Sequence, residues 1–144
     1  VPSSLNLGLD VRIPSEYIGD ENQRQRIYNK ISDAKTTEDA GRILDELEDR
    51  YGRAPDALRT LLQFSLLKTK AERIGVEAVE RRQGALNIKF HKESRIDPAR
   101  LMQMVSTVKG AQFTPAGVLR LPLDGISDAD KVLTALESYF DQLV

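Results

Sequence analysis

The chain has 144 residues, with 21 Lys and Arg against 22 Asp and Glu, one His, and no Cys or Trp. This length predicts a single domain whose core is large enough to fold without metals or disulfides. The net charge of −1 argues against a dedicated nucleic-acid or membrane-surface binder, because such proteins usually carry a large excess of one sign. The lack of Cys excludes disulfide scaffolds, thiol nucleophiles and Cys-ligated zinc.

The sequence offers no signal for membrane insertion or export. No apolar run approaches the roughly 20 residues that a membrane-spanning helix needs, and no basic-then-apolar signal pattern opens the chain. Because the sequence starts at Val1 rather than Met, we expect it to be a fragment of a larger protein. We also expect no association with membranes.

The first segment alternates apolar and polar side chains. The apolar ones occupy every second position, at Leu5, Leu7, Leu9, Val11 and Ile13. This period predicts a strand or an extended arm with one buried face. Pro14 ends the pattern and favours an extended backbone at Ile13. We expect residues 1–19 to form an N-terminal arm, covered either by this domain or by a missing neighbour.

Three helices are predicted next. The first runs from Asp20 to about Asp33. The second follows an N-cap signal with first-turn acids at Thr36-Thr37-Glu38-Asp39 and ends at Tyr51, before Gly52, with apolar residues on one stripe. That stripe contains Ala40, Ile43, Leu44, Leu47 and Tyr51. The third runs from Pro55 to about Ile74 and is apolar over a wide arc, which is typical of a helix packed on several sides.

The second half of the chain predicts short strands and two helices. The strands 76–82 and 85–90 are predicted to form a hairpin around Gln83-Gly84, followed by a helix from Asp97-Pro98 to Lys109-Gly110. Short strands follow at 112–114 and 118–123. The last helix starts with a variant capping box at Ser127-Asp128-Ala129-Asp130. We therefore predict an α+β fold with helices packed on a small, mainly antiparallel sheet. Residues 20–144 are expected to form one domain after the arm.

No motif indicates catalysis. The sequence has no Walker A run, no G-x-G-x-x-G, no H-E-x-x-H and no EF-hand loop. The single His91 alternates with apolar residues of the predicted hairpin, so we interpret it as a solvated residue at a strand end. We expect no catalytic residue, no bound cofactor and no metal in this chain, and hence no enzyme activity of its own.

Carboxylates are dense along and beside the second helix. They are Glu38, Asp39, Asp45, Glu46, Glu48, Asp49 and Asp56. Exposed carboxylates keep near-normal pKa values, which argues against acid–base catalysis there. One interpretation is a solvated face, with an ion pair between Glu46 and Arg50 worth about 0.2–0.5 kcal/mol. The other is a protein-recognition patch formed by Glu46, Asp49 and Arg50. The pattern alone favours the first, but Asp49 near the negative end of the helix dipole favours the second.

A basic cluster surrounds the predicted hairpin. It contains Arg81, Arg82, Lys89, His91, Lys92 and Arg95. A small RNA- or DNA-binding module is therefore an alternative function. Such modules stack bases on exposed aromatic side chains, and the local aromatic, Phe90, is in phase with apolar residues and is interpreted as core.

Two stretches carry a family resemblance. The first is Ile13-Pro14-Ser15-Glu16-Tyr17-Ile18-Gly19-Asp20 with Arg24 and 26–31, and the second is Glu46-Leu47-Glu48-Asp49-Arg50-Tyr51-Gly52 with Pro55 and Leu61-Leu62. Together they resemble the C-terminal domain of the bacterial transcription-repair coupling factor (Mfd) family. The resemblance spans nearly the whole chain, and its specific motifs lie in the first half.

The resemblance implies a regulatory role without catalysis. The parent protein would be an ATP-driven translocase on double-stranded DNA, using ATP and magnesium, that removes stalled RNA polymerase and recruits the excision-repair protein UvrA. The C-terminal domain would dock on the N-terminal UvrB-like module of the same chain, mask its UvrA-binding surface and so be autoinhibitory. The residues carried over as contacts to that module are Glu46, Asp49 and Arg50. The resemblance also implies a cytoplasmic protein and a monomeric fragment.

Overall fold

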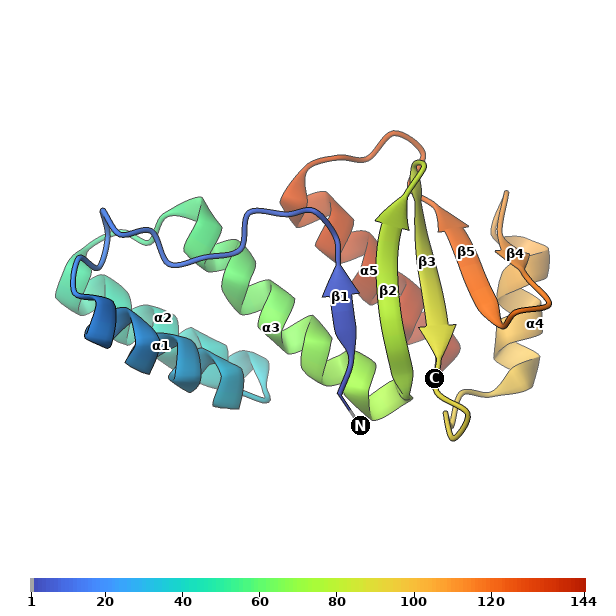
Figure 1. Ribbon diagram of the computed structural model, residues 1–144, viewed down its shortest axis with the longest axis horizontal. Helices are drawn as coiled ribbons and strands as arrows, with labels where there is room; N and C mark the ends of the chain where they lie inside the picture. The colour runs from blue at the N-terminus through green and yellow to red at the C-terminus, as the bar shows by residue number, and fades with distance from the viewer. Residues whose placement is uncertain (1) are drawn as a thin grey trace. The chain divides into compact units, whose positions relative to one another are not determined.

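The computed structural model describes residues 2–144, and Figure 1 labels its helices and strands. In chain order they are β1 (Ser4–Asn6), α1 (Glu21–Asp33), α2 (Thr37–Tyr51), α3 (Asp56–Ile74), β2 (Val76–Arg82), β3 (Ala85–Phe90), α4 (Pro98–Thr107), β4 (Gln112–Phe113), β5 (Val118–Pro122) and α5 (Ala129–Leu143). Three helices lie between β1 and β2 in the chain, and the five strands form one sheet that is mainly antiparallel. The predicted α+β class is confirmed.

The chain forms two compact units. Unit 1 contains residues 1–8, of which 2–8 are described, together with Leu67–Val144, and unit 2 contains Leu9–Leu66. Helix α3 runs through the boundary at residue 66. The segment 1–19, expected to be an arm, therefore supplies residues to both units.

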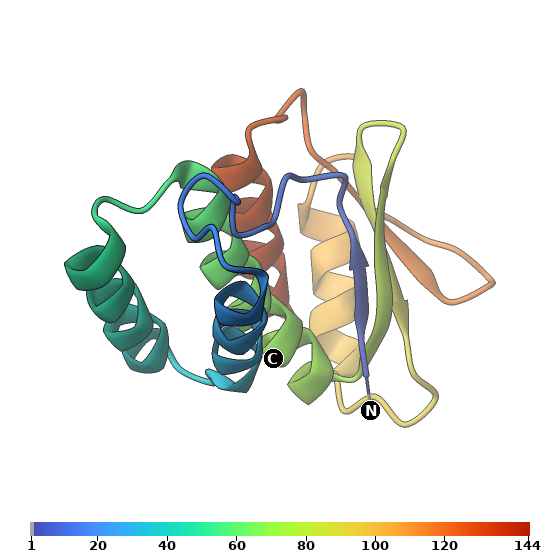
Figure 2. The same cartoon turned by 60° about the vertical axis from the view of Figure 1, so that its left-hand side comes forward.

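Unit 1 is built on a five-stranded sheet. Its strand order is β1-β2-β3-β5-β4, with β1 parallel to β2 and the other neighbours antiparallel. A row of apolar side chains crosses the sheet, because the register places Leu5, Val79, Ile88 and Leu119 side by side. In Figures 1 and 2, α4 and α5 lie on one face of this sheet. The core of unit 1 is the layer between that face and these helices.

The other face of the sheet is polar. The same registers place Asn6, Glu80, Asn87, Arg120 and Gln112 in one row across it. The register shifts between Val76 and Ala78, so Glu77 is an extra residue of β2, as in a β-bulge. The Glu77 carboxylate lies 3.3 Å from Lys89 Nζ and 3.8 Å from His91 Nδ1.

His91 is less exposed than predicted. Its side chain is only 19% exposed, and its Nε2 lies 3.3 Å from the backbone oxygen of Pro2. His91 does follow the end of β3, as predicted, but it is only partly solvated. Two tertiary contacts cover His91: the Glu77 carboxylate at the bulge and the Pro2 backbone of the N-terminal segment. Alternation within one strand does not reveal such contacts.

Unit 2 packs α1, α2 and the first part of α3 around its own core. The core residues are Ile13, Ile18, Ile31, Ala34, Ala40, Ile43, Leu47, Ala54, Leu58 and Leu62. The arm enters this core through a turn in which the N–H groups of Tyr17 and Ile18 donate to the Pro14 oxygen. The Tyr28 hydroxyl accepts from Ile13 N at 2.8 Å and fixes the arm to α1.

Of the segment expected to be a strand or an extended arm, Leu5 to Ile13, only the first residues lie in a strand. Strand β1 covers only Ser4–Asn6, because Gly8 has φ of +66° and turns the chain out of the extended direction. Leu5 and Leu7 are buried in unit 1 and Ile13 is buried in unit 2. The alternation correctly marked buried side chains, but they belong to different cores.

Two smaller expectations are also corrected. Asp128 is the N-cap of α5, but its side chain makes no capping hydrogen bond, so the predicted capping box at 127–130 does not form. Phe90 is half-buried rather than fully in the core. It ends β3, where fewer neighbours cover it than cover Leu86 and Ile88.

Candidate docking surface at the end of helix α2

Helix α2 is set by a complete capping box. The Thr36 hydroxyl accepts from Asp39 N at 3.0 Å, and the Asp39 carboxylate accepts from Lys35 N at 3.1 Å and Thr36 N at 3.3 Å. The hydrogen bond from Lys35 N–H lowers the pKa of Asp39 below its ordinary value of 3.8. The hydrogen bonds from Thr36 and the charge of Arg42 act in the same direction. The box fixes where α2 starts and hence which of its later residues face outward.

The inward face of α2 determines what its other side exposes. Ala40, Ile43 and Leu47 are buried in the core of unit 2. Glu46, Asp49 and Arg50 are all exposed. Their spacing of three and four residues places them together on one side of the C-terminal half of the helix. We call these three residues the α2 patch.

The charges of the α2 patch are paired differently from the sequence expectation. Glu46 Oε2 lies 2.6 Å from Lys30 Nζ of α1. Arg50 instead lies over the Tyr51 ring, with its Cζ 5.3 Å from the ring centroid. The predicted ion pair between Glu46 and Arg50 is therefore wrong. The reason is that α1 brings a competing cation to Glu46, while the neighbouring ring attracts the guanidinium.

Asp49 has no ion pair among the described residues. It is exposed and lies in the last turn of α2, where the helix dipole disfavours a negative charge. The carboxylate therefore remains available to a cation from outside the chain.

Two tyrosines support the end of α2. The Tyr17 hydroxyl lies 2.6 Å from the Gly52 oxygen and 3.1 Å from the Leu47 oxygen, and these two carbonyls share its single hydrogen. Burial, followed by the charge of Glu48, raises the pKa of Tyr17 above 10.0, so the hydroxyl stays protonated and able to donate. The rings of Tyr17 and Tyr51 lie 5.8 Å apart. The end of α2 is therefore held by the arm.

The connection from α2 to α3 is also fixed. Glu48 Oε2 accepts from Ala54 N at 2.8 Å and from Arg59 at 3.0 Å. Gly52 allows the chain to leave α2 with φ of +89°. Glu48 thus supports the loop instead of extending the α2 patch.

A hollow lies beside this end of α2. It has a volume of about 460 Å³ and is lined by Pro14, Tyr17, Pro55 and Ala57, with Arg12, Glu16 and Arg53. Arg12 is paired with Asp10 at 2.9 Å. Because Tyr17 both lines the hollow and holds the end of α2, this largely apolar depression adjoins the segment that carries the α2 patch.

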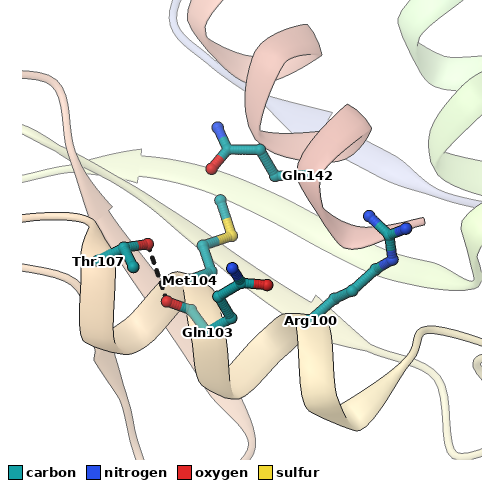
Figure 3. A pocket seen from close by; sticks show the side chains of 5 residues that line it. All are labelled: Arg100, Gln103, Met104, Thr107 and Gln142. Atoms are coloured by element: carbon teal, nitrogen blue, oxygen red, sulfur yellow. Dashed lines mark hydrogen bonds between the residues drawn. The ribbon is translucent and has the colours of Figure 1, made fainter.

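Other hollows and side-chain groups of the described residues give weaker indications of a binding site. A hollow between α4 and α5 has a volume of about 180 Å³ and is lined by Arg100, Gln103, Met104, Thr107 and Gln142 (Figure 3). Its Thr107 hydroxyl already donates to the Gln103 oxygen at 2.8 Å. Over residues 2–144, no group of three or more His, Cys, Asp or Glu side chains could hold a metal ion. Within the same residues, no helix has the length and apolar character needed to cross a bilayer.

The basic residues near the hairpin do not gather on one surface. Arg81 and Arg82 lie at the β2–β3 turn, whereas Lys89 and His91, followed by Lys92 and Arg95, lie toward the opposite end of β3. Glu80 and Glu77 lie beside several of them, with Arg82 Nε 3.9 Å from Glu80. The predicted cluster is thus divided and partly neutralised.

The residues that sequence reasoning missed are the supports of the α2 patch. Lys30 pairs with Glu46 across two helices, and no spacing rule within one helix would reveal this. The contact of Tyr17 with α2 was also missed. Its only sequence signal is the tyrosine within the first family-like motif.

Comparison with known proteins gives a consistent family. The TRCF domain model matches residues 7–101. The transcription-repair-coupling factor of Escherichia coli (strain K12) is 31% identical over 103 residues, which cover 72% of this chain and 9% of that protein. The one from Myxococcus xanthus is 29% identical over 144 residues, which cover 94% of this chain and 12% of that protein.

A solved structure is similar over almost the whole chain. It is a crystal structure of the C-terminal domain of transcription-repair coupling factor, with a TM-score of 0.85, 26% identity, and coverage of 99% of this chain and 91% of that chain. The chain spans between 9% and 12% of the length of the two relatives named above.

Proposed function

Because this chain belongs to the transcription-repair coupling factor family, as a C-terminal domain of that factor, we propose that it is a regulatory domain that docks on another module of its own parent protein. The domain itself carries out no catalysis. Its partner is the N-terminal UvrB-like module, and docking masks the surface that binds UvrA. In this role the domain is autoinhibitory.

The observation that carries this proposal is the α2 patch. Glu46, Asp49 and Arg50 are exposed together at a helix end that the arm holds in place. Carboxylates beside a guanidinium suit a partner surface that carries arginines and an acid. The α2 patch therefore supports a specific contact with a protein.

The nature of the α2 patch also suits a contact that must be reversible. Charged interfaces contribute more to specificity than to affinity. Two modules on one chain need only a weak interface, because tethering gives a high effective concentration. Changing the ratio of open to docked molecules from 1:99 to 99:1 requires about 5.5 kcal/mol of binding free energy from the releasing partner.

For the parent protein we propose the activities implied by its family. It is an ATP-driven translocase on double-stranded DNA, with ATP and magnesium bound outside this chain, that removes stalled RNA polymerase and recruits UvrA for nucleotide excision repair. Binding of RNA polymerase or DNA elsewhere in the protein would supply the free energy that releases the docked domain.

The test is a double charge reversal in the full-length factor, Glu46→Lys with Asp49→Lys. It replaces attraction to a basic partner surface by repulsion. We expect higher affinity for purified UvrA and higher ATPase activity in the absence of RNA polymerase. UvrA binding is measured by surface plasmon resonance and ATP hydrolysis by a coupled assay.

A matched control separates the α2 patch from net charge. Glu93→Lys with Glu137→Lys changes the net charge equally at exposed positions of unit 1 that make no ion pair within residues 2–144. This control should leave UvrA binding unchanged. The Glu46→Lys, Asp49→Lys protein must keep the circular dichroism spectrum and thermal midpoint of the unmodified factor. If it does so and binds UvrA with unchanged affinity, the α2 patch is not the docking site.

A further inference from the structure

A second hollow lies in unit 1, at the end of the sheet where the β2–β3 hairpin turns. It has a volume of about 470 Å³. Three segments form it: Leu7 and Gly8 after β1, residues 81–84 of the hairpin, and Leu123 with 125–127 before α5. Figure 1 shows the hairpin turn and the β5–α5 connection at this same end of the sheet. Neither the α2 patch nor the proposed docking involves this hollow.

The charged side chains that line this hollow are both cationic. They are Arg81 and Arg82. Arg81 is half-buried, and its Nη1 donates to the Leu7 oxygen at 3.2 Å, which holds the guanidinium in place. Arg82 Nε is 3.9 Å from Glu80, too long for a hydrogen bond, so its donors remain available. Arg120 adds a third guanidinium at the turn, where it donates to the Gln83 oxygen at 3.3 Å.

The acid nearest in sequence, Glu80, lies 3.9 Å from Arg82 and offsets part of its charge, while two aspartates near the hollow are directed to other partners. Asp128 lies 3.9 Å from Lys131. The charge of Asp124 acts on Tyr139, whose pKa is raised chiefly by burial and then by this carboxylate. Neither aspartate lines the hollow. Among the described residues, no carboxylate residue lines the hollow, so the charge of its lining is positive.

The rest of the lining suits a ligand with a charged and an apolar part. Gly8, Gly84 and Gly125 line the hollow, and a Cβ added to any of them would meet nothing within 4 Å. A ligand could therefore approach the backbone closely at all three positions. Leu7, Leu123 and Ile126 supply an apolar wall, and the Ser127 hydroxyl supplies a further hydrogen-bonding group.

We propose that this hollow binds the phosphate group of a phosphate ester, held by Arg81 and Arg82 with its organic part against the apolar wall. The planar guanidinium group matches phosphate oxygens with parallel hydrogen bonds, which makes arginine suited to this ligand. Two cations without a lining carboxylate favour an anion over a neutral or cationic molecule. The phosphate could come from a free nucleotide or from the backbone of a nucleic acid.

The experiment measures binding to the full 144-residue chain by isothermal titration calorimetry at low salt. Its ligands are inorganic phosphate, AMP, ATP, a single-stranded oligonucleotide and a DNA duplex. We expect at least one phosphate ester to bind, and Arg81→Gln with Arg82→Gln to weaken it by about tenfold or more. Binding of AMP or ATP alone assigns a nucleotide, whereas binding of an oligonucleotide or the duplex alone assigns a nucleic-acid backbone.

Two further variants separate binding in the hollow from a general effect of charge. Ser127→Glu places a carboxylate at the hollow without touching the Arg81 contact to Leu7, and it should also abolish binding. Lys92→Gln with Arg95→Gln removes the same charge from exposed positions after β3 and should leave binding unchanged. The proposal is overturned if none of the ligands binds, or if the Ser127→Glu chain, folded by its thermal midpoint, binds as tightly as the unmodified chain.

Discussion

At the scale of single residues, the start of α2 depends on Thr36. Its hydroxyl accepts from Asp39 N, one of the N–H groups that has no partner within the helix. Thr36→Ala removes this acceptor and should lower the free energy of unfolding by about 1 kcal/mol. Thr37→Ala, at the next position, is the matched control, because Thr37 is exposed and its side chain makes no hydrogen bond within residues 2–144.

Urea unfolding followed by circular dichroism measures both variants. The Thr36 variant should unfold at a lower urea concentration with the same m-value, since the surface exposed on unfolding is unchanged. Equal midpoints for the Thr36 and Thr37 variants would contradict the capping role.

Asp39 gives the chain a component of stability that depends on pH. Its pKa in the folded chain lies below the ordinary value of 3.8 because N–H groups of Lys35 and Thr36 and the charge of Arg42 stabilise the carboxylate. This stabilisation is complete above the unfolded pKa and is lost as the pH falls through the folded pKa. Asp39→Asn keeps an oxygen acceptor but cannot titrate.

We predict that the unmodified chain loses more free energy of unfolding than the Asp39→Asn variant when the pH is lowered from about 5 to about 3. Urea midpoints at the two pH values measure this difference. Parallel losses in the two proteins would show that Asp39 does not contribute to the acid dependence.

At the scale of elements, the arm and α2 are joined by the Tyr17 hydroxyl. Tyr17→Phe keeps the ring but leaves the Leu47 and Gly52 carbonyls without this donor. We expect the free energy of unfolding to fall by about 1 kcal/mol, and the amides of the last turn of α2 to exchange faster with solvent. Hydrogen exchange followed by NMR measures the local effect.

Tyr51→Phe is the control for this substitution. Its hydroxyl makes no hydrogen bond among the described residues, and its ring also packs at the end of α2. If Tyr51→Phe accelerates exchange as much as Tyr17→Phe does, loss of a hydroxyl as such, and not the link to the arm, causes the effect.

The sequence was most informative where an element is determined locally. The limits of β2 and β3 agree with the predicted hairpin, 76–82 and 85–90, because Gln83 and Gly84 both adopt the positive φ that such a turn requires. Helix α2 starts at its predicted cap for the same reason. Period and capping depend on neighbours in sequence, which a single chain reveals.

Features that depend on distant residues were not predictable in this way. Leu7 belongs to one unit and Leu9 to the other, and the alternation of Leu5, Leu7 and Leu9 does not reveal this change. In the α2 patch, exposure of Glu46 followed from helix period, but its pairing with Lys30 requires the packing of α1 against α2. Local pattern thus predicts which side chains are presented, and tertiary packing decides with what they pair.

At the scale of the whole molecule, the proposed docking contact should be sensitive to salt. Exposed charges such as Glu46 and Asp49 lose most of their long-range attraction as the Debye length falls from about 10 Å at 0.1 M to about 3 Å at 1 M. With the chain and the UvrB-like module as separate proteins, we expect affinity to fall about tenfold over that range.

Fluorescence anisotropy of the labelled chain measures this dependence. The Glu46→Lys, Asp49→Lys variant should bind weakly at low salt and show little further loss. A salt-independent affinity for the unmodified chain would instead indicate an apolar contact, such as the hollow beside Tyr17.

The parallel pairing of β1 with β2 has a consequence for how the chain is made. The Ser3 hydroxyl donates a hydrogen bond to the backbone oxygen of Val76, 73 residues further along the chain. At ribosomal rates of about 5–20 residues per second, the N-terminal strand leaves the ribosome roughly 4–15 s before its partner exists. Leu5 and Leu7, both buried in the finished sheet, remain uncovered during that interval, while all of Leu9–Leu66 is synthesised. The outermost strand of the sheet is therefore made well before its partner, and its length of only three residues limits the edge that it offers for aggregation.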